Sequence, residues 1–455
     1  MNILFIRPKP TPATIGLQHL MIVEPLELEI LSALVKESHE TRVIDMILEH
    51  RTVDYFIKKF TPDVICLTGY ITHIPVIIEY CKIAKHINSN IKTIVGGVHI
   101  EKFPGDIDHE SVDYRVVRNA TITFPKLLDF LNGKSDFPTG VLGTHEVLNE
   151  DLLPDYDFYV PLPDRELTAK YRRNYFYVFH NKVALIKTSF GCPFRCKFCF
   201  CRVITGDNYF VRPLGEVMDE LESIYEKEIY IVDDDFLLSA DRIREFIRLL
   251  KERKIRKNYL VYGRADFISN NPGLIKDFKE VGLRTVIVGL ESFEDFELQG
   301  FNKLTNSNTN TQAMRVLNKY KVDCYAAVII SPSWSVEDFK KAGDIMMDLG
   351  IKFVNLQPLT PLKGTGLLVN EENLIIERTD YPKWDLAHVS IRPEKMSIED
   401  FYRNILDLYQ KIVLNPRNLI GFLKYPVTMQ LKMTRGIIKV RKQYKDKIME
   451  VAENA

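Results

Sequence analysis

Four of the seven cysteines in this chain lie within ten positions, in the stretch SFGCPFRCKFCFC. They are Cys192, Cys196, Cys199 and Cys201. Thiols at this density could form disulfides, bind zinc, act as a redox-active dithiol or hold an iron–sulfur cluster. The cellular compartment, the spacing of the cysteines and the elements around them decide between these chemistries.

The compartment is predicted from the first residues and from hydropathy. The chain begins MNILFIRPKP, without a basic segment ahead of an apolar one, and no run of apolar residues reaches about 18. We therefore predict a cytoplasmic protein without a membrane-spanning helix. In a reducing compartment, clustered cysteines are more often metal ligands or catalysts than disulfides. Lys+Arg and Asp+Glu are both 61, so the net charge gives no support for a nucleic-acid partner.

The first three cysteines have the spacing C-x3-C-x2-C directly after an apolar run. A zinc site usually takes four ligands, commonly from two separated pairs, and the sequence has no second pair. A thioredoxin-type dithiol would account for Cys196 and Cys199 but not for Cys192. A [4Fe–4S] cluster normally takes four cysteines, so three thiolates would leave one iron open to a ligand. Cys201 is a fourth ligand or, as we favour, a bystander, since two residues is a short reach back.

Residues 1–135 are predicted to form a domain whose sheet has a ligand-binding edge. Apolar runs at NILFI, TRVID, DVICLTG, KTIVGG and YRVVRN alternate with helical spacing, which predicts a parallel sheet with helices on both faces, a Rossmann-like domain. Ligands in such folds bind beyond the carboxyl ends of the strands, here LTGY and VGGVH. The residues expected there are Thr68, Gly69, Gly96 and Gly97. The glycines either admit a large ligand close to the backbone or only make turns.

The rest of the chain divides into three further regions. Residues 136–181 are rich in Pro, Asp and aromatic residues without a steady period, and we interpret them as a linker. Residues 182–375 contain six apolar runs, each followed by a segment of helical character, which predicts a partial (βα)6 barrel of the TIM type with its site at the carboxyl ends of the strands. Residues 376–455 are predicted to be a helical C-terminal region.

The cysteine motif after the first barrel strand, with Phe198 before its third cysteine, resembles that of the radical S-adenosylmethionine (SAM) superfamily. Further segments match in the same order: IVDDDF, VYGRAD, GLRTVIVGLES and LQPLTPLKGTGL. The last resembles the TPxPGT segment of a branch that carries an N-terminal cobalamin-binding domain. The implied fold is α/β, with a B12-binding-type Rossmann domain, a radical SAM barrel and a C-terminal helical extension.

The resemblance implies that Cys192, Cys196 and Cys199 are the metal ligands and catalytic centre, holding a [4Fe–4S] cluster whose open iron binds SAM. In the family, one electron cleaves SAM to methionine and a 5′-deoxyadenosyl radical, which abstracts a substrate hydrogen. An electron donor such as flavodoxin or ferredoxin is implied as a partner.

Further SAM contacts are implied residue by residue. Asp234 or Asp235 would lie near the amino group of SAM. Arg264 would pair with its carboxylate, a geometry that suits a guanidinium group. Glu291 would accept hydrogen bonds from the ribose hydroxyls, as acidic residues do in dinucleotide-binding folds.

The same branch implies cobalamin on the first domain, and the sequence departs from the branch at two points. It has no D-x-H-x-x-G motif, although His73 and His99 lie in the expected neighbourhood. Relatives usually show a Gly-Glu-Gly-Glu run after the fifth strand, where this chain has RNATITF, with Arg118 and Ala120 in place of two glycines. Either the corrin is held differently or the domain has lost it; we expect it to be bound.

The expected activity is cobalamin-dependent C-methylation of an unactivated carbon. The alternative is a radical SAM reaction without methyl transfer, such as oxidative cyclisation, rearrangement or carbon–carbon bond formation, on a lipid-, porphyrin- or natural-product-like substrate. A third hypothesis is a non-catalytic binding protein with a closed four-ligand metal site that includes Cys201. In the last 40 residues, basic and apolar residues alternate at helical spacing, which suits either peripheral contact with a membrane or packing on the protein itself.

Overall fold

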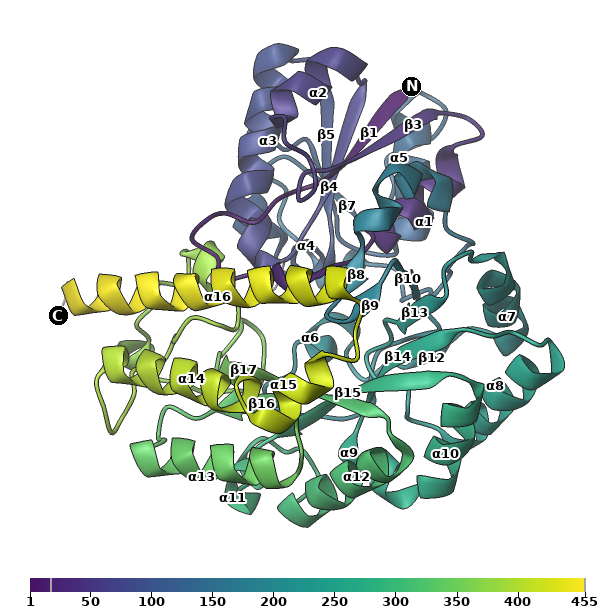
Figure 1. The fold of residues 1–455 in the computed structure, drawn as a ribbon. Coiled ribbons are helices and arrows are strands. Elements are labelled where there is room, and N and C mark those ends of the chain that lie inside the picture. Colours follow the sequence, from purple (N-terminus) through teal and green to yellow (C-terminus); the bar gives the residue numbers. More distant parts are fainter. Residues whose placement is uncertain (17–18, 454–455) are drawn as a thin grey trace. The chain divides into compact units, whose positions relative to one another are not determined.

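The computed structural model describes residues 1–16 and 19–453, which form two compact units (Figure 1). Unit 1 comprises Met1–Thr14, Glu24–Tyr175 and Thr379–Asp385. Unit 2 comprises Ile15–Val23, Phe176–Arg378 and Leu386–Ala455. Each unit therefore contains segments that are distant in the sequence.

Unit 1 is built on a six-stranded sheet with the order β3-β1-β4-β5-β6-β7. All neighbours pair in parallel except β7, which is antiparallel at one edge. The parallel sheet predicted from the sequence is confirmed. The strands are β1 (Asn2–Arg7), β3 (Glu40–Asp45), β4 (Val64–Thr68), β5 (Lys92–Gly96), β6 (Tyr114–Val116) and β7 (Val141–Gly143).

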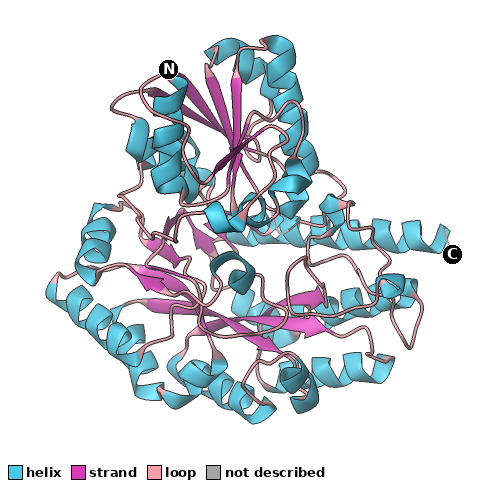
Figure 2. Ribbon diagram, turned by 180° about the vertical axis from the view of Figure 1, so that it is seen from behind, coloured by secondary structure: helices cyan, strands magenta, loops and turns pink. Residues whose placement is uncertain are grey.

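Helices cover both faces of this sheet, as predicted (Figure 1 and Figure 2). The helices are α1 (Leu26–Val35), α2 (Val53–Phe60), α3 (Ile74–Ile87), α4 (Val98–Lys102) and α5 (Ala120–Leu131). Helices α1 and α5 pack together, and so do α2 and α3. The central strands are apolar on both faces, because both faces are covered. Phe5 on β1, for example, contacts Phe124 on α5, with ring centroids 5.9 Å apart.

Unit 2 contains a parallel sheet whose six strands follow one another in sequence order, β10-β13-β14-β15-β16-β17. This confirms the predicted (βα)6 arrangement. The strands are β10 (Val183–Ile186), β13 (Glu228–Ile231), β14 (Asn258–Gly263), β15 (Leu283–Glu291), β16 (Asp323–Ile330) and β17 (Phe353–Pro358). The helices between them are α6 (Cys201–Thr205), α7 (Leu214–Ser223), α8 (Ala240–Glu252), α9 (Ala265–Asn270), α10 (Pro272–Val281), α11 (Asp295–Gly300), α12 (Ser307–Tyr320) and α13 (Val336–Asp348).

Local sequence fixes where several of these helices begin. The side chains of Ser239, Asn306 and Ser335 accept backbone N–H groups at the first turns of α8, α12 and α13. Such caps satisfy donors that have no partner inside the helix. The caps therefore set where α8 and α13 begin after β13 and β16, and where α12 begins after α11.

The amino end of the barrel is filled by a hairpin, β8 (Phe176–Tyr177) and β9 (His180–Asn181), which pairs with β2 (Met21–Ile22). The ring of Tyr177 lies 5.0 Å from Tyr230 and 6.0 Å from Tyr325, both on barrel strands. His180 bonds Glu228 and Thr285 at 2.7 and 2.9 Å. Packed aromatic rings close this end, which leaves the carboxyl edge as the place for chemistry.

Residues 136–181, interpreted from the sequence as a linker, contain regular elements. They include β7, the 3-10 helices Glu150–Leu152 and Arg165–Asn174, β8 and β9, and they are divided between the two units. The strands in this stretch have two or three residues each and its helices are of the 3-10 type, so the stretch has neither the period of a long strand nor that of an α-helix.

The helical C-terminal region predicted for residues 376–455 begins at Ile398, with α14 (Ile398–Val413), α15 (Pro416–Phe422) and α16 (Val427–Glu453). Residues 376–397 are irregular apart from the 3-10 helix Tyr381–Lys383. Helix α14 packs against α13 and α16. Among the described residues, no helix has the length and apolar character that crossing a membrane requires.

Candidate active site

The cysteine loop leaves the barrel after β10 and the short strand β11 (Ser189–Phe190), which pairs with β12 (Phe210–Val211). Gly191 begins the loop at φ +89°, and a Cβ there would lie 2.1 Å from the carbonyl oxygen of Asn208. Its N–H donates to Asp234 at 2.9 Å. Only glycine fits this turn, which anchors the loop to the end of β13.

The three predicted ligands line this loop in the reduced form. Cys196 is buried, and Cys192 and Cys199 are half-buried. Burial raises the pKa of Cys192 to about 12 and also raises that of Cys196. The pKa of Cys199 is instead lowered to about 7, because the thiol and the backbone N–H of Cys201 both donate to its sulfur. Cys201 therefore lies against a predicted ligand as a hydrogen-bond donor.

The cysteine loop supplies the ligands of a cluster rather than those of a single metal ion. Within residues 1–16 and 19–453, no three His, Cys, Asp or Glu side chains converge as ligands of a single metal ion. A [4Fe–4S] cluster needs no such convergence, because each thiolate binds a different iron. Three free thiols from one loop match that donor set. Arg264 adds a positive charge, with Nη1 3.9 Å from Sγ of Cys196. The residues present fit the cluster.

The acidic run after β13 contains three aspartates with different surroundings. Asp233 is buried and accepts hydrogen bonds from the backbone N–H and hydroxyl of Thr188 and from the hydroxyl of Ser189, at 2.6, 2.5 and 2.7 Å. Asp234 accepts from the loop at Gly191 and lies 3.6 Å from Nζ of Lys187. Both carboxylates therefore join β13 to the start of the cysteine loop.

Asp235 differs from its two neighbours. It is only 3% exposed, and neither carboxylate oxygen has a hydrogen-bond partner among the described residues. Burial raises its pKa to about 7, against the opposing effect of the Arg264 and Lys303 cations. A buried acid without a donor is costly unless a ligand supplies one. The sequence left Asp234 and Asp235 as equal candidates for the amino group of SAM, and this contrast favours Asp235.

Arg264 follows β14 and lies at the cysteine loop. Its Nε and Nη2 atoms bond Asp266 at 3.0 and 3.1 Å, and Nη2 also donates to the carbonyl of Lys303 at 2.7 Å. The guanidinium lies 3.6 Å from the ring centroid of Phe194. Asp266 thus occupies the fork that was predicted to take the SAM carboxylate, so that role of Arg264 stays a prediction.

Glu291 ends β15 at an irregularity in the pairing with β16. Its φ is +62°, a left-handed conformation that is strained for a non-glycine residue and is concentrated at functional sites. Its Oε1 atom accepts from Nζ of Lys303 at 2.9 Å, and both side chains are buried. A Cβ on Gly289 would lie 2.2 Å from that oxygen. The strand is therefore shaped around this buried ion pair, and the ribose contact predicted for Glu291 stays a prediction.

Lys303 is a site residue that sequence reading missed. The carboxylate of Glu291 and the thiol of Cys196 outweigh the effect of burial and hold its pKa above the usual value. Its ammonium lies 5.7 Å from the ring centroid of Phe198, the predicted aromatic residue of the motif. Lys303 thus places a positive charge at the cysteine loop, although it lies in none of the segments whose sequence resembles the family.

The segment that carries Lys303 also holds the cysteine loop. The N–H of Lys197 donates to the carbonyl of Phe301 at 2.9 Å, and the Asn302 amide donates to the carbonyl of Arg195 at 2.8 Å. Phe198 packs edge-on against Phe301, with centroids 5.6 Å apart. These contacts carry no sequence period or motif. Asn302 and Leu304, on either side of Lys303, both take the left-handed conformation, with φ values of +53° and +58°.

Replacing Lys303 by methionine is expected to destabilise the apo protein by about 3–5 kcal/mol, because the substitution leaves the Glu291 carboxylate buried without a cation. Adding Glu291→Gln should recover most of the loss. Urea unfolding of the single and double variants measures both. Lys341→Met is the matched control, since it breaks an exposed pair with Glu294 and should cost less than about 1 kcal/mol. A Lys303→Met effect no larger than the control would contradict the structural role of the pair.

The ligand edge predicted on unit 1 lies at the ends of β4 and β5. A Cβ on Gly97 would lie 2.9 Å from both the carbonyl of Gly69 and Oγ1 of Thr68, and a Cβ on Gly69 would lie 2.7 Å from that of His73. Both glycines are therefore required by packing within the protein. Gly96 differs, because its nearest neighbour, Val116, would be 3.7 Å away. Only at Gly96 does the structure leave room that internal packing does not explain.

The two histidines near this edge are held inside unit 1. Nδ1 of His73 accepts the N–H of Tyr70 at 3.2 Å, and burial lowers the pKa of His73 to about 4. Nε2 of His99 lies 2.9 Å from a carboxylate oxygen of Asp106. The edge thus presents backbone and short side chains, which suits a large planar ligand held without a histidine. The residues present fit a corrin bound in that way.

Arg118 stands where relatives of the branch have a glycine. Its guanidinium stacks 3.7 Å from the ring centroid of Tyr156, and Asn119 after it takes the left-handed conformation that begins α5. The substituted run therefore still makes a tight turn, with asparagine in place of glycine.

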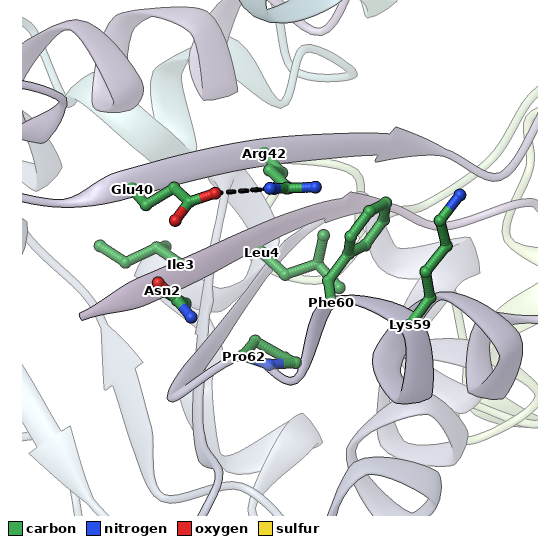
Figure 3. A pocket seen from close by; sticks show the side chains of 8 residues that line it. All are labelled: Asn2, Ile3, Leu4, Glu40, Arg42, Lys59, Phe60 and Pro62. Atoms are coloured by element: carbon green, nitrogen blue, oxygen red, sulfur yellow. Dashed lines mark hydrogen bonds and ion pairs between the residues drawn. The ribbon is translucent and has the colours of Figure 1, made fainter.

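A pocket of about 120 Å³ lies at the other edge of the same sheet (Figure 3). Figure 3 shows Arg42 bonded to Glu40 beside the ring of Phe60. The pocket opens at the amino ends of β1 and β3, opposite to the edge where ligands bind in such folds. We assign it no role in the chemistry.

Comparisons with known proteins agree with the two units. The family model for the Radical SAM superfamily matches residues 186–346, and the model for the B12 binding domain matches residues 14–128. The chain is 28% identical over 420 residues to a hopanoid C-3 methylase of Methylococcus capsulatus, which covers 90% of this chain and 80% of that protein. It is 22% identical over 399 residues to an anaerobic magnesium-protoporphyrin IX monomethyl ester cyclase of Cereibacter sphaeroides, covering 81% of this chain and 62% of that protein.

The fold is also similar to that of a solved enzyme. The structure of the radical SAM methyltransferase TsrM from Kitasatospora setae, with cobalamin and a [4Fe–4S] cluster bound, superimposes with a TM-score of 0.64 at 15% identity. The match covers 98% of this chain and 99% of TsrM. At this identity, the likeness supports the fold of both units together with their order along the chain.

Proposed function

Because this chain belongs to the radical SAM superfamily and carries a B12-binding domain, we propose that it is a cobalamin-dependent methyltransferase that acts on an unactivated carbon. The observation that carries the proposal is the match to a named methylase over 90% of the chain, across both domains. A single-domain radical SAM match would support the radical chemistry but not the methyl transfer.

When bound, the cluster supplies the electron that cleaves SAM, and cobalamin supplies a carrier for the methyl group. In this proposal Cys192, Cys196 and Cys199 hold the cluster. The buried carboxylate of Asp235 accepts the amino group of SAM, which would give that carboxylate the donor it lacks. Lys303 keeps a positive charge beside the thiolates and orients the carboxylate of Glu291.

We propose an apolar polycyclic substrate, since one relative is named for a hopanoid and another for a porphyrin. A flavodoxin or ferredoxin would donate the two electrons that each turnover needs, one for SAM cleavage and one to restore cobalamin. Two SAM molecules would be consumed per turnover: one donates its methyl group and leaves as S-adenosylhomocysteine, and the other yields methionine and 5′-deoxyadenosine.

The alternative is radical chemistry without methyl transfer, favoured by the match to the anaerobic cyclase. The two reactions differ in their products. The methylase forms S-adenosylhomocysteine and 5′-deoxyadenosine in equal amounts, whereas a cyclisation or coupling forms the second without the first.

The test uses the full chain, reconstituted anaerobically with iron, sulfide and hydroxocobalamin and incubated with SAM, a strong reductant and an extract of the source cells. Both nucleosides are quantified by mass spectrometry, with the Cys196→Ala variant as the background control. We expect equal amounts of both, together with a metabolite heavier by one methylene. 5′-Deoxyadenosine alone, from protein that shows corrin absorbance, would overturn methylation in favour of the alternative.

A further inference from the structure

The C-terminal helices of unit 2 carry a strongly biased charge. Between Pro416 and Lys445, thirty residues include eight Lys or Arg and no Asp or Glu, although the whole chain has 61 of each charge. This stretch covers α15 and most of α16 (Figure 1). A run of this kind marks a surface that meets negative charge.

The same helices expose apolar side chains in a stripe. Helix α16 packs against the unit through Met429, Met433, Gly436, Tyr444 and Ile448. Its opposite face exposes Val427, Leu431 and Ile438 by 68%, 53% and 61%. Spacings of four and seven residues place these three side chains on one line along the helix.

Helix α15 and the turn after it also expose apolar side chains. Leu419, Ile420 and Leu423 are exposed by 45%, 71% and 69%. We call Val427, Leu431 and Ile438 on α16, together with Lys432, Arg435, Lys439 and Lys442, the basic–apolar face. Clustered exposed apolar side chains mark an interaction surface, whereas scattered ones are ordinary.

A groove of about 450 Å³ lies beside this stripe. It is lined by His19, Thr428, Leu431, Lys432, Arg435, Gly436 and Lys439. Three of these side chains are lysine or arginine and none is acidic, so the groove suits an anionic group. Gly436 lets α16 approach closely, since a Cβ there would lie 2.2 Å from the carbonyl of His19.

We propose that the basic–apolar face docks the protein on an anionic phospholipid membrane. The exposed leucine, isoleucine and valine side chains enter the headgroup–acyl boundary, and the cations contact phosphate groups, one of them in the groove. A second copy of the chain fits poorly, because a two-fold interface places the same cationic face opposite itself. An acidic protein partner would match the charge but leaves the apolar stripe unexplained.

The test measures sedimentation of the full chain with vesicles, without SAM, iron or cobalamin, so that it is independent of the reaction. We expect binding to vesicles of phosphatidylglycerol and phosphatidylcholine, weak binding to phosphatidylcholine alone, and release by high salt. Lys439→Glu/Lys442→Glu should lower the partition coefficient at least about 25-fold, since each of the two lost cations contributes about one factor of five. Lys227→Glu/Lys251→Glu, at exposed positions outside the face, is the charge-matched control.

A second pair of variants tests the apolar stripe. Leu431→Gln/Ile438→Gln should lower the partition coefficient about tenfold or more, because both side chains lose their burial in lipid. Val147→Gln/Leu152→Gln removes two exposed apolar side chains elsewhere and should leave binding unchanged. Equal binding to neutral and anionic vesicles, or equal effects of test and control variants, would overturn the proposal. A wild-type protein that binds no vesicles would also overturn the proposal. A dimer in solution that the α16 variants convert to a monomer would do the same.

Discussion

Replacing Cys196 by alanine is expected to abolish both cluster binding and SAM cleavage. Its thiol is the middle ligand of the three and the most buried of them, and it is the one against which Arg264 places a guanidinium nitrogen. The variant keeps Cys192 and Cys199 as ligands and loses the third. Among the described cysteines near the cluster, only Cys201 could replace it. Iron and sulfide content, the absorbance of the reconstituted protein and the yield of 5′-deoxyadenosine measure the loss.

Cys201→Ala is the informative companion to that variant. The thiol of Cys201 donates to the sulfur of Cys199, which makes it a modifier of a ligand in this structure. We therefore expect full iron content and turnover close to wild type, with a more negative reduction potential, because hydrogen bonds to cluster sulfurs tune it. Cys201→Ser keeps a donor and should shift the potential less. Loss of the cluster in Cys201→Ala would mean four protein ligands, as the structural-metal hypothesis requires.

The six barrel strands could be predicted from the sequence because each contains a short apolar run that is followed by a segment of helical character. The cysteine loop could be found because three ligands from one loop must be close in sequence. Both are local patterns, in which the residues that act together are also neighbours along the chain.

Lys303 could not be found in this way. Its importance depends on a bulge that turns Glu291 inward and on a segment after α11 that folds back over the cysteine loop. The run of three aspartates was ambiguous for a related reason. Asp233 and Asp234 have hydrogen-bond partners in the segment that follows β10, whereas Asp235 has none among the described residues. Three adjacent aspartates therefore have different surroundings in the fold.

Asp235→Asn is expected to stabilise the apo protein at pH 8 while weakening its binding of SAM. The pKa of Asp235 is raised from 3.8 to about 7, because the carboxylate is buried without hydrogen-bond donors. The folded state therefore holds a proton that the unfolded state has released between about pH 4 and pH 7. Over that window the free energy of unfolding falls as pH rises, and the penalty is complete above pH 7.

Removing the charge removes this penalty, although the amide is also buried without partners. The amide and the protonated carboxyl are both neutral and unpartnered, so we expect little difference from wild type near pH 4, where the wild-type carboxyl is protonated in the folded state, and a gain of about 4 kcal/mol at pH 8, measured by urea unfolding. Asp241→Asn, whose side chain is 96% exposed, is the control and should show no such pH dependence. A variant less stable than wild type at pH 8 would contradict the unpartnered state of Asp235.

SAM binding reverses the balance. A cationic amino group placed against Asp235 gives the carboxylate a charge-assisted hydrogen bond, and losing one typically costs about 1.5–3 kcal/mol, or roughly 10- to 100-fold in affinity. Equilibrium dialysis of SAM against reconstituted wild type and Asp235→Asn measures this loss. Unchanged affinity in a variant with full iron content would remove Asp235 from the SAM site. The same carboxylate thus lowers the stability of the empty protein and raises its affinity for the ligand, the trade that a preorganised binding site makes.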